Sequence, residues 1–153
     1  MIKDLIEKGL ISKLSGIAQY KNRKEIYVGK NKTIEIISAD AAILRSYLKS
    51  GPLVWSKSYK NYMLDGKCIY FDINKNKQET NYKAGKKDGK CKTWRGSYIF
   101  AEANYKEGRL HGKAIMYIAP KKPGQIDYYK DGKWIGVECY GLKGKLLSKY
   151  FKE

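Results

Sequence analysis

Histidine and cysteine are scarce in this sequence. His111 is the only histidine, and the three cysteines, Cys68, Cys91 and Cys139, form no Cys-x-x-Cys pair. Zinc sites and disulfide frameworks need such residues in closely spaced sets. We therefore expect neither, and no pattern indicates another metal or a cofactor.

Long apolar runs are also missing. Charged residues interrupt residues 1–17 every two or three positions, so we expect no signal peptide there. No segment approaches the roughly 20 apolar residues that a membrane-spanning helix requires. These absences predict a cytoplasmic protein.

Acidic residues are outnumbered two to one. The chain has 32 Lys and Arg against 15 Asp and Glu, a formal net charge of +17 over 153 residues. This excess favours an acidic partner, which could be a protein surface, a nucleic acid or an anionic membrane. Alternatively, the lysines keep an extended sheet soluble and protect its edges from pairing. The length fits one domain or one short repeat array, and 42% hydrophobic residues indicate a folded chain with a thin core.

Tyrosine and glycine, in contrast, recur with a 23-residue period. The period links Tyr59, Tyr82 and Tyr105, and it also links Gly66, Gly89 and Gly112. A fourth copy begins one residue late at Tyr129 and has Gly136 in the matching place. The copies read YKNYMLDGKCIYF, YKAGKKDGKCKTW, YKEGRLHGKAIMY and YKDGKWIGVECYG. Copy one has Tyr62 in place of the first glycine and copy four has Ile135 and Val137, so we expect altered turns or edges there.

Each copy is typical of a β-hairpin. The dipeptides between the extended segments supply the positive φ that a two-residue turn needs, and they are Ala84-Gly85, Glu107-Gly108 and Asp131-Gly132. The facing pairs expected in copy two are Lys83 with Lys86, Tyr82 with Lys87, and Thr80 with Gly89. We expect the ring of Tyr82 to lie across the bare backbone of Gly89, which would explain a glycine within a strand.

Strand alternation predicts two unlike faces. One is apolar and expected to be packed, and in copy three it comprises Ala103, Tyr105, Leu110, Gly112, Ala114 and Met116. The other carries rows of lysine, and in copy two it comprises Glu79, Asn81, Lys83, Lys86, Asp88, Lys90 and Lys92. Cys68 and Cys91 fall two strands apart in one column, about 9.5 Å. A disulfide needs α-carbons within roughly 7 Å, so none is expected.

The pattern Tyr-Lys-x-Gly-x-x-Asp/His-Gly-Lys resembles the MORN (membrane occupation and recognition nexus) repeat over residues 53–142. It is most similar to the bacterial variant found in small toxin–antitoxin proteins. The resemblance implies a single twisted antiparallel sheet of stacked β-hairpins, no catalytic residue, and a role as scaffold, protein-binding surface or lipid binder.

We therefore expect a mainly β fold with three parts: a small N-terminal α/β cap (1–52), the MORN-like array (53–142) and a basic C-terminal tail (143–153). Residues 24–37 alternate around a turn at 29–32 and predict another hairpin. Residues 2–14 could form a short amphipathic helix that caps the open end of the sheet.

Residues 38–52 have two interpretations. A helix is favoured, with Ser38 or Asp40 as N-cap and Gly51-Pro52 as its stop. Its apolar stripe would comprise Ile43, Leu44, Tyr47 and Leu48. Alternatively, Tyr47 lies 23 residues before Tyr70, so this segment could be the last strand of a degenerate earlier copy.

An enzyme is not expected. His111 occupies the column of Asp65 and Asp88, so its repeat position accounts for it. The Gly-Lys pairs belong to no Gly-x-x-x-x-Gly-Lys-Ser/Thr phosphate loop. Tyrosines among lysines could stack nucleic-acid bases, but the recurring tyrosines are better explained as packing positions.

The candidate binding residues are cations of the basic face and aromatic residues at strand ends, where exposed aromatics often anchor partners. They are Lys83, Lys86, Lys90, Trp94, Tyr98, Phe100, Lys106, Arg109, Lys113 and Tyr117. The first hypothesis is a non-enzymatic antitoxin, immunity protein or small inhibitor that binds an acidic protein. The second is a binder of nucleic acid or anionic lipid, and the third a scaffold that assembles edge to edge. No small-molecule substrate is expected.

Overall fold

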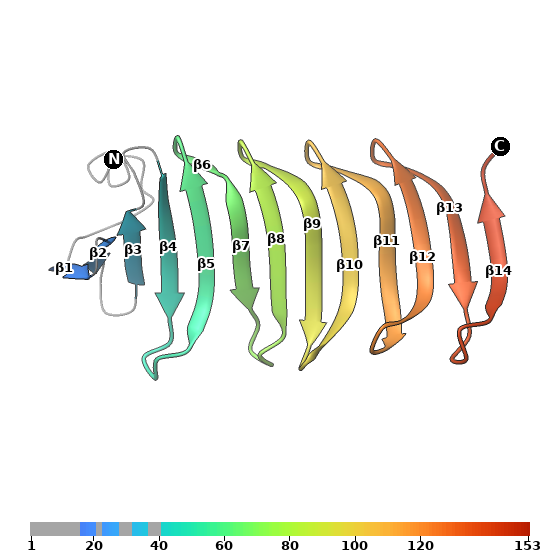
Figure 1. Cartoon of the computed structure of the whole chain (residues 1–153), viewed down its shortest axis with the longest axis horizontal. Helices are drawn as coiled ribbons and strands as arrows, with labels where there is room; N and C mark the ends of the chain where they lie inside the picture. Colours follow the sequence, from blue (N-terminus) through green and yellow to red (C-terminus); the bar gives the residue numbers. More distant parts are fainter. Residues whose placement is uncertain (1–15, 21–22, 28–31, 37–40) are drawn as a thin grey trace.

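A computed structural model of the chain describes residues 16–20, 23–27, 32–36 and 41–153, the first three segments as backbone. The described residues form one antiparallel sheet and no helix, which confirms the mainly β fold (Figure 1). The strands are β1 Gly16–Tyr20, β2 Arg23–Tyr27, β3 Lys32–Ile36, β4 Ala41–Tyr47, β5 Leu53–Lys60, β6 Met63–Leu64, β7 Gly66–Phe71, β8 Lys77–Lys83, β9 Lys86–Arg95, β10 Tyr98–Lys106, β11 Arg109–Ala119, β12 Lys122–Lys130, β13 Lys133–Tyr140 and β14 Leu146–Phe151. Strand order follows chain order, and the short β6 pairs with β5 beside β7.

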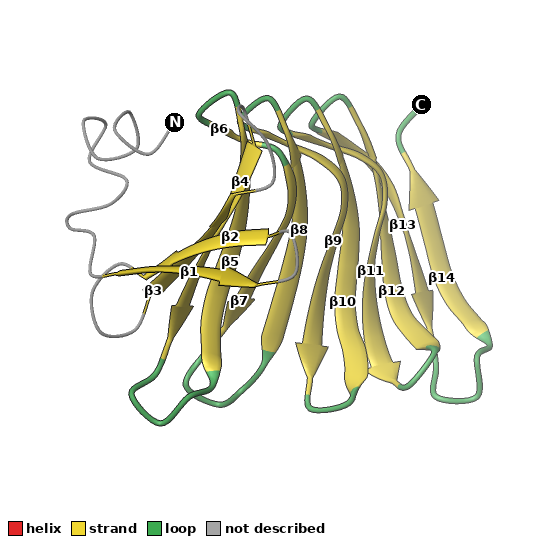
Figure 2. Ribbon diagram, turned by 60° about the vertical axis from the view of Figure 1, so that its left-hand side comes forward, coloured by secondary structure: helices red, strands yellow, loops and turns green. Residues whose placement is uncertain are grey.

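The sheet is a single curved layer (Figure 2). Few side chains of the described residues are buried. Within the described residues the buried hydrophobic side chains are Ala42, Leu44, Cys91 and Ile126. The thin core is as predicted. The expected packing of the apolar face is not seen within residues 41–153, where Met116 on that face remains 51% exposed.

The two-residue turns have the predicted backbone conformation. Ala84 and Gly85 have φ values of 48° and 81°, and the corresponding dipeptides 107–108 and 131–132 are similar. Both positive values match the turn whose twist suits a β-hairpin. The pairs Lys83 with Lys86 and Tyr82 with Lys87 are confirmed.

Beyond those pairs the predicted register is wrong, because the glycines of the first three copies sit in irregular, bulged parts of the strands. Thr80 pairs with Cys91 rather than with Gly89, and residues 88–90 lie opposite the single Asn81. Gly66, Gly89 and Gly112 have φ values of 92°, 88° and 82°. A bulge residue in this conformation favours glycine, which has no Cβ to clash with the backbone.

The recurring tyrosine therefore faces the glycine of the preceding copy. Tyr82 pairs with Gly66, and Tyr105 pairs with Gly89. A Cβ at Gly89 would meet Asn81 at 3.6 Å rather than a tyrosine ring, and one at Gly112 would meet nothing within 4 Å. Positive φ, rather than ring cover, thus explains the recurring glycine.

Copy four is the exception. Gly136 has no positive φ, and a Cβ there would collide with the ring of Phe151, its directly opposed partner on β14. Here an aromatic ring does cover a strand glycine, but the ring comes from the following strand.

The N-terminal segment contains a strand, β4, where the sequence pattern favours a helix. β4 pairs with β3 and β5, and its alternate residues Ala42 and Leu44 are buried. This corrects the helix prediction and confirms that the segment is a strand, whereas its origin as a degenerate repeat copy stays a prediction. The predicted hairpin is confirmed by the pairing of β2 with β3, whereas the helix predicted for residues 2–14 lies outside the described residues.

The C-terminal segment 143–153 is not simply a basic tail. Residues 146–151 form β14, which pairs with β13 along its length. Contacts such as that between Phe151 and Gly136 hold this strand on the sheet.

The cysteines are free, as predicted. Cys68 pairs with Thr80, which pairs with Cys91 two strands from Cys68. The Thr80 hydroxyl and the Cys91 sulfur are 3.2 Å apart. Cys91 is buried and Cys68 is half-buried, so both act as small interior side chains, and burial raises the pKa of Cys68.

Candidate binding surface

The connections between strands lie in two unlike rows, one at each end of the strands (Figure 1). Each row is called an edge below, which is distinct from the outer strands of the sheet. We call the first the turn edge, formed by the two-residue turns 61–62, 84–85, 107–108 and 131–132. We call the second the loop edge, formed by the connections 48–52, 72–76, 96–97, 120–121 and 141–145.

Successive turns are stacked on each other by backbone hydrogen bonds. The N–H groups of Gly85, Gly108 and Gly132 each donate to a carbonyl of the preceding hairpin, over 2.8 Å in each case. The turn edge therefore has a regular spacing, and adjacent turns lie two strands apart, about 9.5 Å.

The Asp/His column caps these turns. Asp65 accepts a hydrogen bond from the N–H of Ala84 over 3.1 Å, and Asp88 does the same for Glu107. His111 lies in the third such place, with its Nδ1 3.2 Å from Oδ1 of Asp131. Ile135 of copy four precedes β14 rather than another turn, so no cap is required there.

The bulges are fixed by a polar residue that the sequence reasoning missed. Asn81 and Asn104 donate from their side-chain amides to the carbonyls of Lys90 and Lys113, over 2.9 and 3.1 Å. Ser58 donates to the carbonyl of Lys67 over 2.8 Å. The sequence feature that points to this residue is a Ser or Asn directly before the tyrosine in three copies.

The turn edge carries cations in pairs. Each of the last three turns is flanked by two exposed cations, and the pairs are Lys83 with Lys86, Lys106 with Arg109, and Lys130 with Lys133. None of these six side chains makes an ion pair within the described part of the chain. They are therefore available to a partner.

Lysines further down the strands are engaged internally. Glu79 forms ion pairs with Lys67 at 3.3 Å and Lys77 at 3.0 Å. Burial alone would raise the pKa of Glu79, but hydrogen bonds from Lys77 and Lys67 hold it below its ordinary value. These lysines neutralise a neighbour and are poor candidates for partner contact.

The other two glutamates of this row are held by tyrosines. Tyr117 donates to Glu102 over 2.9 Å, and Tyr128 donates to Glu138 over 2.8 Å. Burial, then these hydrogen bonds, raises the pKa of Tyr117 and of Tyr128 to about 12. The rings are thereby fixed in orientation at the surface.

Three of the four predicted aromatics converge at the loop edge. Trp94, Tyr98 and Tyr117 line a hollow of about 430 Å³ together with Ser97, Ile99, Pro120 and Lys121. Lys77 Nζ lies 3.9 Å from the Trp94 ring centroid. Phe100 lies outside this set, with the Arg95 guanidinium 3.6 Å from its ring centroid.

The predicted site is therefore divided. Lys83, Lys86, Lys106 and Arg109 lie at the turn edge, while Trp94, Tyr98 and Tyr117 lie at the loop edge. Lys90 and Lys113 lie between them, as the last residues of their bulges.

A second hollow at the loop edge was not predicted. Its volume is about 570 Å³, and it is lined by Leu48, Pro52, Leu53, Val54, Tyr70, Phe71, Asp72, Ile73 and Lys75. The sequence feature that points to this hollow is Ile73 within the turn sequence DINKN, because a turn position usually faces solvent and is rarely apolar.

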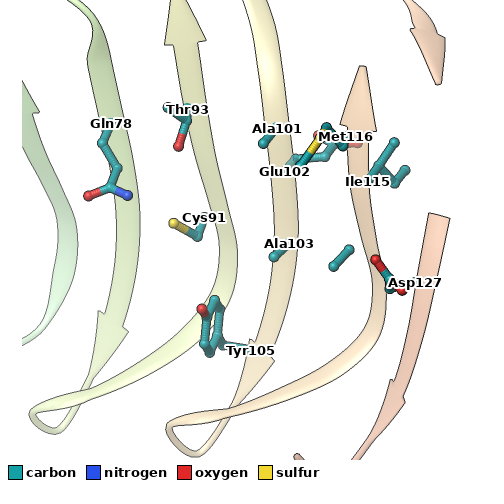
Figure 3. A pocket seen from close by; sticks show the side chains of 11 residues that line it. Gln78, Cys91, Thr93, Ala101, Glu102, Ala103, Tyr105, Ile115, Met116 and Asp127 are labelled. Atoms are coloured by element: carbon teal, nitrogen blue, oxygen red, sulfur yellow. The ribbon is translucent and has the colours of Figure 1, made fainter. Parts of the chain in front are cut away.

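The apolar face has two grooves among the described residues. One, of about 240 Å³, is lined by residues of β5, β7 and β8. The other is a shallow groove of about 270 Å³ (Figure 3). Its side chains come from β8 to β12 and include small residues such as Cys91, Ala101 and Ala103. The carboxylate of Asp127 in this groove accepts hydrogen bonds from Gln125 and Trp134. The groove thus provides contact area.

Within the described ranges, no group of three or more His, Cys, Asp or Glu could hold a metal ion. The same residues include no helix long and apolar enough to cross a membrane.

No protein-family model matches the sequence, and a search of curated proteins gives no significant match. Among solved structures, the crystal structure of TarM is similar over 74% of this chain, with 11% identity and a TM-score of 0.37. The chain spans 22% of the length of that protein.

Proposed function

We propose that this is a non-enzymatic cytoplasmic protein that binds an acidic partner protein and blocks or scaffolds it. The observation that carries the proposal is the set of six cations at the turn edge, none with an ion pair inside the described chain. Elsewhere on the sheet, Lys67, Lys77, Lys92 and Lys149 form ion pairs with Glu79, Glu102 or Glu138. Lys90 and Lys113 form none within the described residues, but each is a single cation rather than one of a pair at a turn.

The spacing of these cations is fixed by the turns. Stacked backbone hydrogen bonds hold the three pairs in line, so no ordering of the main chain is required on binding. Exposed charges in such an array mainly raise the rate of association and select against cationic partners. Contacts elsewhere must then slow the dissociation of the complex and so determine its lifetime.

The test compares two variants of equal net charge. In the turn-edge variant the four cations at 83, 86, 106 and 109 are replaced by glutamine. In the loop-edge control the four replaced lysines are Lys121, Lys122, Lys143 and Lys145, which lie outside the first two loops of that edge. Each tagged protein is used for nuclease-treated affinity purification from host cells, and the association rate of the recovered, identified partner is measured.

We expect the turn-edge variant to associate about tenfold or more slowly at low salt, and the control to change much less. Equal losses in both variants would show that net charge alone matters and would reject the turn edge as the binding surface.

Nucleic acid is the second candidate, favoured by one observation. Trp94, Tyr98 and Tyr117 form an aromatic hollow beside Lys121, and single-stranded nucleic acids bind by stacking bases on aromatics next to cations. A gel-shift titration of labelled oligonucleotides separates the two candidates, because affinity for nucleic acid falls steeply as salt rises. Failure of all tested oligonucleotides to shift would reject this alternative.

A further inference from the structure

The loop-edge hollow of about 570 Å³ lies between two rigid loops. Its walls come from the β4–β5 connection, residues 48–52, and the β7–β8 connection, residues 72–76, whose strands β5 and β7 pair in the sheet. Leu48 and Pro52 close the first loop with an N–H···O bond of 2.8 Å. The hollow is thus a preformed feature of neighbouring hairpins.

The second loop is fixed by one carboxylate. Asp72 Oδ1 accepts the N–H groups of Asn74 and Asn76, each over 2.8 Å, and its Oδ2 accepts the Asn76 side-chain amide over 2.9 Å. Hydrogen bonds from Asn76, above all, hold the pKa of Asp72 below its ordinary value. The carboxylate is engaged by its own loop and stays ionised.

This rigid loop presents an apolar side chain to solvent. Ile73 is 97% exposed, and Leu48 across the hollow is 55% exposed. An apolar side chain on a hydrogen-bonded loop, next to an apolar hollow, is typical of the central anchors of protein–protein interfaces, because little main-chain ordering is required on binding.

The charge around the hollow indicates the occupant. Lys75 lines it and Lys49 follows Leu48 in the first loop, whereas Asp72 is engaged by backbone and side-chain amides. The remaining lining residues are largely apolar, so the hollow offers few polar groups that would orient a small molecule.

We propose that this hollow, here called the loop-edge anchor site, holds the apolar side chains of an acidic amphipathic segment of the partner protein. The carboxylates of that segment lie against Lys49 and Lys75, while Ile73 inserts between its apolar residues. This inference rests on the proposed function and deepens it: the turn edge speeds association and the anchor site sets the lifetime of the complex.

The test uses a fluorescein-labelled synthetic helix-forming peptide with leucine on one face and glutamate on the other. One control peptide has alanine for leucine, and a second has lysine for glutamate. Binding to the full chain is measured by fluorescence anisotropy. The protein variants are Leu48→Ser/Ile73→Ser and, as a matched control, Leu142→Ser, which alters a 71% exposed leucine in another loop of the same edge.

We expect the leucine–glutamate peptide to bind and both control peptides to bind far more weakly. The double variant should weaken binding by about tenfold or more, as removal of a central anchor does. Leu142→Ser should leave binding within about twofold, as an exposed residue outside the anchor does. Because the altered side chains are exposed, unchanged thermal unfolding is expected and shows that the fold is intact.

The remaining outcomes separate this inference from the proposed function. If the double variant binds as wild type while the turn-edge variant associates slowly, the anchor site is rejected and the proposed function stands. If the turn-edge variant associates normally while the double variant loses binding, the proposed role of the turn edge is rejected and the anchor site stands. No binding of the peptide to wild type rejects the acidic segment. Binding of anionic vesicles that requires Ile73 rejects a protein occupant in favour of a lipid.

Discussion

The turn edge and the loop edge, which are the two rows of strand connections, are built in different ways. At the turn edge, each repeat unit uses a two-residue turn, and all but the last add a capping Asp or His and a bulge glycine of positive φ. At the loop edge, connections range from the two residues 96–97 to the five residues 72–76. Each contains a residue of positive φ, but the connections share no common length or sequence. The repeat therefore specifies the fold, and residues outside it give the protein its individual surface.

The edges also differ in chemistry. The turn edge exposes cations in pairs at a regular spacing. The loop edge also has lysines, but without a regular spacing, and it exposes Leu48, Ile73 and Leu142 at 55%, 97% and 71%. An edge with fixed, repeated charge suits long-range attraction, and an edge with unique apolar shapes suits selection of one partner. Breaking the devices of the turn edge should therefore cost stability, while changes at the loop edge should not.

The largest effect is expected at a bulge glycine. Gly112→Ala places a Cβ on a residue with φ of 82° where nothing lies within 4 Å, so it isolates backbone strain. We expect a loss of about 1–3 kcal/mol in the free energy of unfolding, measured by urea denaturation.

The matched control is Gly141→Ala at the loop edge. This glycine has no positive φ, and its Cβ would lie 3.5 Å from Leu147, an ordinary contact. A change within about 0.5 kcal/mol is expected. If both variants lose equal stability, positive φ is not the reason for the repeat glycine.

A smaller loss is expected from removing a turn cap. Asp88→Ala deletes the acceptor of the Glu107 N–H and should cost about 1 kcal/mol in urea denaturation. Glu107→Ala removes the same charge from an exposed site on the same edge and should cost much less. Equal losses would attribute the effect to charge rather than to the hydrogen bond.

The period predicted the features of the turn edge because each one repeats. The positive-φ turns, the cation pairs and the column shared by Asp65 and His111 all followed from aligning the copies. The bulge did not follow from this alignment. A glycine within a strand can be explained by an aromatic ring packed over it or by positive φ, and only the register decides between the two. That register depends on residues 88–90 facing one residue of β8.

Non-repeated residues were harder to place. Ile43, Leu44 and Tyr47 satisfy helical spacing, while Ala42 and Leu44 satisfy strand alternation, and pairing with β3 and β5 decides between them. The hollow around Ile73 joins two loops that are adjacent only in the folded sheet. Its residues follow no pattern in the sequence.

Tyr117, in the aromatic hollow of the loop edge, predicts that the stability of the fold depends on pH in the alkaline range. The pKa of Tyr117 is raised to about 12 from an ordinary value of 10, so folding favours its protonated form. This stabilisation is complete below pH 10 and is lost as pH rises from about 10 towards 12. Solvent screening reduces the effect at this partly exposed site.

Tyr117→Phe should therefore flatten the fall in thermal stability between pH 10 and 12, as followed by circular dichroism. Tyr98→Phe is the matched control, because its hydroxyl makes no side-chain hydrogen bond within residues 41–153. An identical alkaline profile for wild type and Tyr117→Phe would contradict a coupling between Tyr117 and Glu102.

The smallest effect is expected from improving a turn. Ala84 occupies the first turn position with φ of 48°, a conformation that asparagine tolerates better than alanine. Ala84→Asn keeps the N–H that Asp65 accepts and should stabilise the fold by about 0.5 kcal/mol in urea denaturation. Asn61→Ala at the equivalent position of copy one should destabilise it by a similar amount. If neither variant changes stability, the cap and the stacked backbone bonds determine the turn, and the preference of its first residue contributes nothing measurable.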